Sequence, residues 1–136
     1  MASIVVDDSR FPLVRVTFDG AVADHVFDAY LHALSRVLSR RAKNVIVFDA
    51  LRAPPPTAKE RAKQAAWLKQ HRDVIERFSC GSAFVIKSAI VRGGLTAILW
   101  IAPIPGAHTV VATVAEAEAW ALARLRDAGV TFGAPP

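Results

Sequence analysis

Two runs of four consecutive apolar side chains, at residues 45–48 and 83–86, constrain the fold of this chain more than any other feature. A strand covered on both faces carries such a run, whereas a strand with one wet face alternates apolar and polar residues. Apolar residues at helical spacing lie between the two runs, with Trp67, Val74 and Phe78 on one stripe. Two buried strands joined by a helix predict a parallel sheet with right-handed helical crossovers.

The segments on either side extend this pattern. Residues 4–6 and 13–18 are rich in β-branched and aromatic side chains, which predicts two strands that pair as a hairpin at the sheet edge. Apolar residues then recur at three- and four-residue spacing over 27–38, which predicts a helix. A last short strand is expected at 108–111.

Helix starts are marked by side chains that cap free backbone N–H groups. Thr57-Ala58-Lys59-Glu60 and Thr113-Val114-Ala115-Glu116 have capping-box spacing, and Ser88 precedes an apolar segment at 89–101. The first of these helices is predicted to run without a break to residue 77 or 78. Gly129 is expected to end the last helix, with residues 130–136 as a loose tail.

The predicted fold is therefore a single α/β domain over residues 1–129, in the order β-β-α-β-α-β-α-β-α. Its sheet is expected to be mixed, mostly parallel and five-stranded, with residues 45–48 and 83–86 at its centre and residues 4–6 near an edge. Hydrophobic residues make up 53% of the chain. The longest apolar run, at 95–104, is half of the roughly 20 residues that span a bilayer. The apolar surplus is thus assigned to a core, a partner surface or both.

Cysteine content and charge narrow the class of protein. Cys80 is the single cysteine and the N-terminus has no secretory pattern, so a cytoplasmic location is expected. Between residues 36 and 77 there are eleven basic and four acidic side chains, against six and eight elsewhere. This basic region could attract an anionic partner, although a solvated helix face is the simpler interpretation. No specific nucleic-acid partner and no transmembrane segment are expected.

Five segments carry a family resemblance, at residues 14–20, 44–49, 83–86, 92–94 and 117–121. In this order they resemble the SpoIIAA-like branch of the STAS fold, a group of bacterial domains. That branch is similar in architecture to sulfate-transporter and anti-sigma-factor-antagonist domains and to CRAL–TRIO lipid-transfer domains. The resemblance implies a regulatory or scaffold role through protein contacts, or a site for a lipid-like ligand.

This sequence departs from the anti-sigma antagonists at one place. Those proteins carry a phosphorylatable serine where the central strand meets its helix. Residues 51–57 here contain neither serine nor glycine, and Thr57 holds roughly the corresponding position. The departure argues against a phosphorylation switch and against a sigma-factor role.

The helix predicted at 89–101 supplies the main candidate site. Val91, Leu95, Ile98 and Ile101 share one side and are expected to face the core, whereas Trp100 points elsewhere. Gly93 and Gly94 also lie in this helix. A glycine inside a helix lowers stability by about 1 kcal/mol relative to alanine, so the pair suggests the close approach of another backbone, a kink or a ligand. A partner- or ligand-binding surface is therefore predicted from Arg92, Gly93, Gly94, Thr96 and Trp100. The alternative is a helix buried in a groove beneath residues 103–105 and the last helix.

A second candidate is an anion site formed by Thr57, Arg52 and Lys59 at a helix N-terminus. The simpler interpretation of Thr57 is a capping residue. Other polar groups are assigned structural roles: a partly buried core position bonded to a backbone carbonyl for His71, and a small buried side chain for Cys80. No catalytic residue is expected.

A metal site is a further alternative, because histidine and carboxylate side chains bind metal ions. His25, Asp28 and His32 follow one another on a helix, but positions seven residues apart are two turns apart. The polar side of an amphipathic helix is the favoured interpretation. Neither a metal nor a cofactor is expected.

The predicted function is a non-enzymatic regulatory or scaffold module that binds a protein partner or a second copy of itself as a homodimer. The alternative is a carrier or sensor that binds a small apolar or lipid-like ligand under the helix at 89–101. An enzyme is the third hypothesis. An apolar patch on the outer face of that helix favours a partner, and a closed apolar cavity beneath it favours a ligand.

Overall fold

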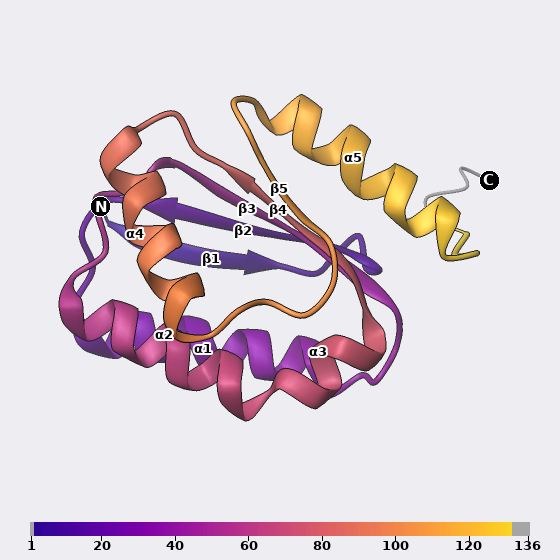
Figure 1. The fold of residues 1–136 in the computed structure, drawn as a ribbon, viewed down its shortest axis with the longest axis horizontal. Helices are drawn as coiled ribbons and strands as arrows, with labels where there is room; N and C mark the ends of the chain where they lie inside the picture. Colours follow the sequence, from indigo (N-terminus) through magenta and orange to yellow (C-terminus); the bar gives the residue numbers. More distant parts are fainter. Residues whose placement is uncertain (1, 132–136) are drawn as a thin grey trace.

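A computed structural model describes residues 2–131 of the chain. The strands are β1 (Ser3–Asp7), β2 (Leu13–Asp19), β3 (Asn44–Arg52), β4 (Ser79–Val85) and β5 (His108–Val111). The helices are α1 (Asp24–Leu38), α2 (Ala58–Gln70), α3 (Arg72–Phe78), α4 (Ala89–Ile101) and α5 (Val114–Asp127). Figure 1 shows them arranged around one sheet.

The five strands lie in the sheet in the same order as in the chain, β1-β2-β3-β4-β5. β1 pairs with β2 antiparallel, and every other neighbouring pair is parallel. The predicted mixed α/β sheet is thus confirmed, with β3 at its centre and β1 at an edge. β3 and β4 are buried along most of their length, as their unbroken apolar runs require.

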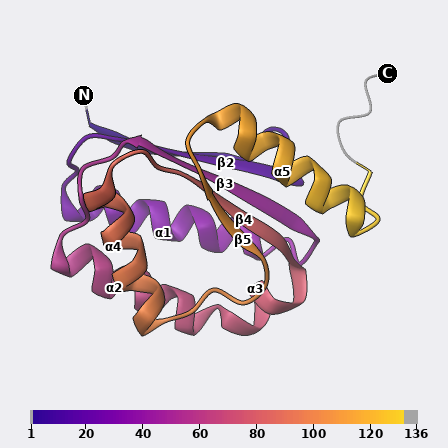
Figure 2. The same ribbon diagram turned by 45° about the horizontal axis from the view of Figure 1, so that its top comes forward.

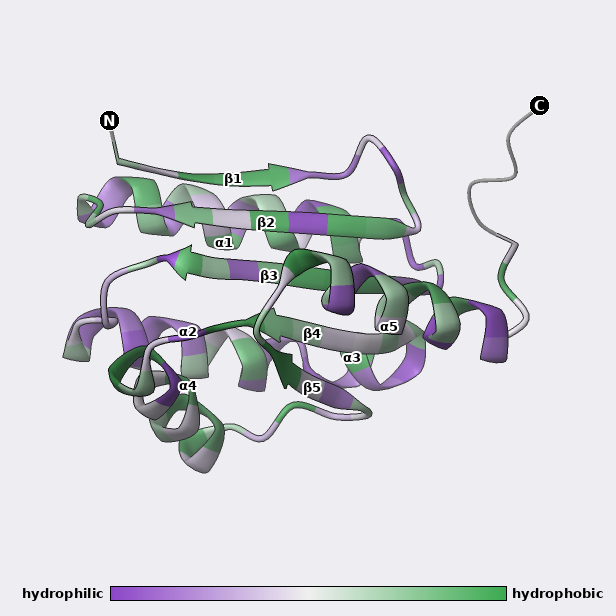
Figure 3. Cartoon of the chain, turned by 90° about the horizontal axis from the view of Figure 1, so that it is seen from above, coloured by the Kyte–Doolittle hydropathy of each residue, from purple (hydrophilic) through white to green (hydrophobic). Residues whose placement is uncertain are grey.

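The helices divide unequally between the two faces of the sheet. α1, α2, α3 and α4 lie on one face, and α5 lies on the other (Figure 2). Crossovers between parallel strands are right-handed, so a sheet that always grows in one direction collects all its crossover helices on one side. α5 follows the last strand and covers the opposite face, where it packs on β3 and β4 (Figure 3).

The predicted helix starts at Thr57, Ser88 and Thr113 are confirmed. Thr57 Oγ1 accepts a hydrogen bond from Glu60 N at 3.1 Å, and Glu60 Oε1 accepts one from Thr57 N at 2.9 Å. Ser88 Oγ accepts from Val91 N, so α4 begins where the sequence predicts. Each bond satisfies a backbone N–H that the first helical turn leaves free.

The long helix predicted after Thr57 is wrong, because the chain bends at His71 and divides it into α2 and α3. The φ and ψ angles of His71 are −103° and 10°, outside the helical range. Its imidazole stacks on the Trp67 indole at 4.5 Å between ring centroids, and Nε2 lies 3.2 Å from Ser35 Oγ. These contacts hold the ring against α1 at the bend.

Three smaller expectations also change. β4 begins at Ser79, four residues before the apolar run, because Ser79, Cys80 and Gly81 already pair or pack within the sheet. Ile101 lies in the last turn of α4 and is 53% exposed, so it is not a core residue. Val130 is not loose, since its N–H donates to Leu125 O at 2.9 Å. The rest of the expected tail, residues 132–136, lies outside the described residues.

Candidate ligand-binding cavity

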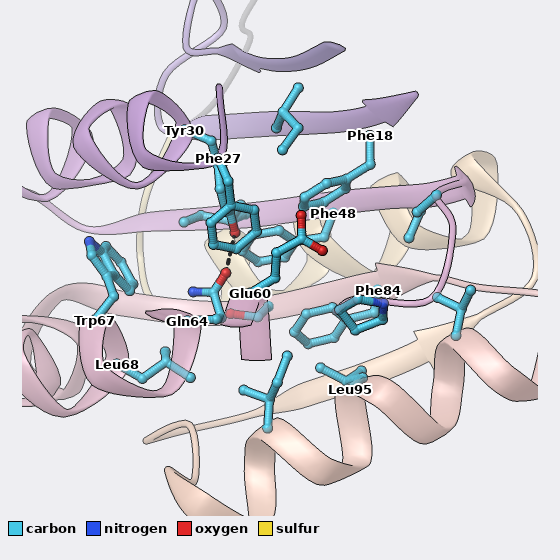
Figure 4. A pocket seen from close by; sticks show the side chains of 18 of the residues that line it. Phe18, Phe27, Tyr30, Phe48, Glu60, Gln64, Trp67, Leu68, Phe84 and Leu95 are labelled. Atoms are coloured by element: carbon cyan, nitrogen blue, oxygen red, sulfur yellow. Dashed lines mark hydrogen bonds between the residues drawn. The ribbon is translucent and has the colours of Figure 1, made fainter. Parts of the chain in front are cut away.

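A cavity of about 250 Å³ lies between the sheet and the helices α1, α2 and α4. Its floor is aromatic. Phe18, Phe48 and Phe84 come from the adjacent strands β2, β3 and β4, and alternation along each strand directs all three to the same face. The Phe48 and Phe84 rings stack with centroids 5.0 Å apart and an angle of 10° between planes. Figure 4 shows these side chains around the open space.

Polar groups line the cavity from the helices and from the strands, where Asn44, Ser79 and Ser82 contribute. Tyr30 on α1 donates a hydrogen bond from its hydroxyl to Gln64 Oε1 on α2, at 2.8 Å. Burial raises the pKa of Tyr30 well above its ordinary value, so the hydroxyl stays protonated. The Tyr30 ring meets Phe18 and Phe27 edge to face, each at 5.3 Å. Glu60, at the first turn of α2, adds a carboxylate.

α4 forms the roof. Val91, Leu95 and Ile98 point from it toward the cavity, as the helical stripe predicts. Gly94 lets the helix approach the loop before α2, because a Cβ there would lie 2.6 Å from the Cγ and Cδ atoms of Pro56. The close approach inferred from the paired glycines is therefore a contact within the chain at Gly94. A Cβ at Gly93 would meet nothing within 4 Å.

The outer face of α4 carries the other residues of the predicted binding surface. Arg92, Gly93, Thr96 and Trp100 are exposed, and Gly94 is turned away from them toward Pro56. Trp100 is 85% exposed, which confirms that it lies outside the core. Ile90, at 70% exposure, adds to the apolar surface of the same helix. The structure thus has a cavity below α4 and exposed apolar side chains on its outer face.

The residues of the predicted anion site already have partners. Arg52 pairs with Asp19 at 3.2 Å, and Lys59 pairs with Asp24 at 2.7 Å. The pKa of the Asp24 carboxyl is lowered by its hydrogen bond to Lys59. Thr57 serves as the helix cap. Part of the basic charge of α2 is therefore paired with acidic side chains of α1, which leaves less of it to bind an external anion.

The remaining candidate residues lie apart from the cavity or serve the core. Asp28 accepts a hydrogen bond from Lys63 Nζ at 2.8 Å, and no three His, Cys, Asp or Glu residues gather into a metal site within residues 2–131. His71 is half-buried with Nδ1 2.9 Å from Trp67 O, which confirms the expected carbonyl contact. Cys80 is buried, and burial raises the pKa of its thiol.

Sequence reasoning did not identify the cavity-lining residues as a site. In the sequence Phe18, Tyr30, Phe48 and Phe84 belong only to strand and helix patterns, and Glu60 only to the capping box. A usable signal is present: each of β2, β3 and β4 carries a phenylalanine, and all three lie on the same side of the sheet.

Comparison with solved structures supports the fold. An uncharacterized protein of the DUF3478 family from Shewanella loihica PV-4, described as having a SpoIIAA-like fold, aligns with a TM-score of 0.65. The alignment covers 89% of this chain and 95% of that one, at 11% sequence identity. No family model and no curated protein matches this sequence. In the part of the chain that the structure describes, every helix is too short or too polar to cross a bilayer.

Proposed function

Proceeding from a SpoIIAA-like fold with an apolar cavity beneath α4, we propose that the chain is a STAS-like, non-catalytic module that binds a small apolar ligand. The cavity carries this proposal. Ligand sites in proteins are concave and mostly apolar, with a few polar groups that orient the ligand. The space between Phe48, Phe84 and Leu95 has this character, and Tyr30, Gln64 and Glu60 are among its polar groups.

The energetics of packing favour an occupant. Side chains around an unfilled apolar space lose dispersion contacts, and cavities destabilise a fold in proportion to their volume. An apolar molecule in this space would restore those contacts and remove its own apolar surface from water. The role of carrier or sensor therefore follows from the same side chains that would otherwise be a packing defect.

The proposal includes no chemical step. Cys80 is the one thiol of the chain, and burial raises its pKa away from the reactive thiolate form. A cytoplasmic location is part of the proposal, supported by a single unpaired cysteine and by the absence of a disulfide framework.

Octanol serves as a probe of the cavity by isothermal titration calorimetry, with native mass spectrometry of the purified protein to detect a retained ligand. Leu95→Trp places a larger side chain into the cavity and should abolish octanol binding. Thr96→Trp, the same new side chain one position along and on the exposed face of α4, should leave binding unchanged. Octanol binding that survives Leu95→Trp, or its absence in the wild type, would contradict the proposal.

The outer face of α4 supports a second candidate, a scaffold role through a protein partner or a homodimer. Trp100 is 85% exposed and Ile90 70%, and Arg92 of the same helix is exposed as well. Tryptophan and arginine are enriched at the centres of protein interfaces. Light scattering of the wild type against Trp100→Ala and Arg92→Glu tests this candidate. A dimer that both substitutions dissociate supports it, and a wild-type monomer over the full concentration range contradicts self-association.

A further inference from the structure

We propose that the ligand of this cavity is a cationic amphiphile, with an ammonium group beside Glu60 and an apolar tail beneath α4. This inference rests on the proposed function, because it assigns the chemistry of the molecule that enters the cavity. It follows from the position of the Glu60 carboxylate, from the partners of the nearby basic side chains, and from the aromatic rings that line the cavity.

The capping box holds the Glu60 carboxylate in place. Glu60 Oε1 accepts the hydrogen bond from Thr57 N at 2.9 Å, which ties the side chain back to the start of α2. Figure 4 shows the carboxylate directed into the space between Phe18, Phe48 and Tyr30. The second oxygen, Oε2, has no hydrogen-bond donor from the described residues. An acceptor is therefore presented to whatever occupies the cavity.

Glu60 is the only charged side chain among the described residues that line the cavity. The basic residues around it in sequence are engaged elsewhere: Lys59 with Asp24 at 2.7 Å, and Lys63 with Asp28 at 2.8 Å. Arg61 Nη1 donates to Pro56 O at 3.0 Å. Glu60 is partly exposed, and one of its carboxylate oxygens has no donor from the described residues. Since no basic side chain among those residues lines the cavity, a cationic group on the ligand would be the partner of this carboxylate.

The surrounding rings suit the same ion. The face of an aromatic ring attracts a cation, and rings grouped around a pocket recognise alkylammonium groups in this way. Tyr30 keeps a fixed ring position because its hydroxyl is bonded to Gln64, and it lies edge-on to Phe18. A carboxylate ligand would instead meet repulsion from Glu60. The tail is accommodated by Phe84, Leu95 and Ile98, which are apolar throughout.

Three probes of equal chain length test the inference by titration calorimetry at pH 7: octylamine, octanol and octanoate. The wild type should bind octylamine about tenfold more tightly than octanol, the ratio expected for one charge-assisted hydrogen bond. Octanoate should bind weakest. Glu60→Gln should abolish the preference for octylamine over octanol, and the fold should be kept, since glutamine also completes a capping box. Glu76→Gln, the same change at an exposed acid outside the cavity, should alter neither.

The comparison of probes in the wild type needs no variant, so it stands even if Glu60→Gln unfolds. Octanol binding with octylamine no tighter, or octanoate tighter than both, would overturn the cationic ligand and leave the apolar cavity site intact. An octylamine preference that persists in folded Glu60→Gln would overturn the role of Glu60. Failure of octanol and octylamine alike would remove the proposed function itself.

Discussion

The two faces of the sheet are packed in opposite ways. On the α5 face, Ala117 and Ala121 are fully buried and bring the helix close to Val45 and Val47, and Leu125 closes the layer at 0% exposure. The other face carries four helices, large aromatic rings and a cavity of about 250 Å³. One sheet therefore supports a tightly filled layer and a hollow one.

Side-chain size explains the difference. Alanines in α5 let its backbone approach β3 and β4 until aliphatic side chains interlock, and Gly81 extends this approach by accepting the Trp120 ring against its Cα. On the other face Phe48 and Phe84 line the cavity, together with side chains of α2 and α4. Both faces have a buried core, and the one beneath α4 also encloses the cavity.

The largest expected effect tests this division with matched leucines. Leu125→Ala should lower the free energy of unfolding by about 3 kcal/mol, because the surrounding layer cannot collapse into the space. Leu95→Ala should cost only about 1 kcal/mol, because Leu95 is half-buried and already borders empty space. Urea denaturation of both variants gives the comparison. Equal losses would show that the two faces do not differ in rigidity.

Substitution of the adjacent glycines in α4 tests whether the helix rests on Pro56. Gly94→Ala should lower the free energy of unfolding by about 1–2 kcal/mol, since the new Cβ would lie 2.6 Å from the Pro56 ring. Gly93→Ala should raise it by up to about 1 kcal/mol, because its Cβ meets nothing and alanine favours the helix. Thermal melting followed by circular dichroism separates them. A stabilising Gly94→Ala would mean that α4 does not rest on Pro56.

Removal of the α2 cap should have a smaller effect. Thr57→Ala should cost about 1 kcal/mol, since the N–H of Glu60 loses its acceptor. Thr57→Asp should be close to wild type, because aspartate also caps and suits the positive end of the helix dipole. Chemical denaturation measures both. If Thr57→Asp abolished ligand or partner binding with stability intact, a phosphorylation switch would have to be reconsidered.

Trp100→Ala should have the smallest effect on folding, within about 0.5 kcal/mol, because the side chain is 85% exposed. Differential scanning calorimetry with light scattering on the same sample reads stability and assembly together. A large drop in melting temperature with the assembly state unchanged would mean that Trp100 is a structural residue, contrary to its exposure.

Much of the fold could be predicted because its signals are local. Unbroken apolar runs marked β3 and β4, and Thr57, Ser88 and Thr113 marked helix starts through bonds within four residues. The bend at His71 could not be predicted, because it depends on a ring contact with Trp67 and on Ser35 from another helix. Tertiary contacts override helix periodicity there.

The cavity was harder to predict than the fold for the same reason. Whether Phe18, Phe48 and Phe84 fill space or enclose it depends on how far α2 and α4 stand from the sheet, and the sequence states no such distance. The hydrogen bond between Tyr30 and Gln64 could not be predicted either, since the two residues meet only when α1 and α2 pack together. The outward position of Trp100 was predictable, because it depends on the angle around one helix.

The order of the strands has a consequence for how the chain assembles during synthesis. Each strand from β2 onward adds to the edge left by its predecessor, so the sheet can grow as the chain leaves the ribosome. Its crossover helices arrive with it, on one side only. The opposite side stays bare until α5 docks, and Leu13, Val45 and Val47 face water until that moment. Docking of α5 is thus the last step in the assembly of the sheet layers. A chain stalled before residue 114 would expose a hydrophobic aliphatic surface to which chaperones bind.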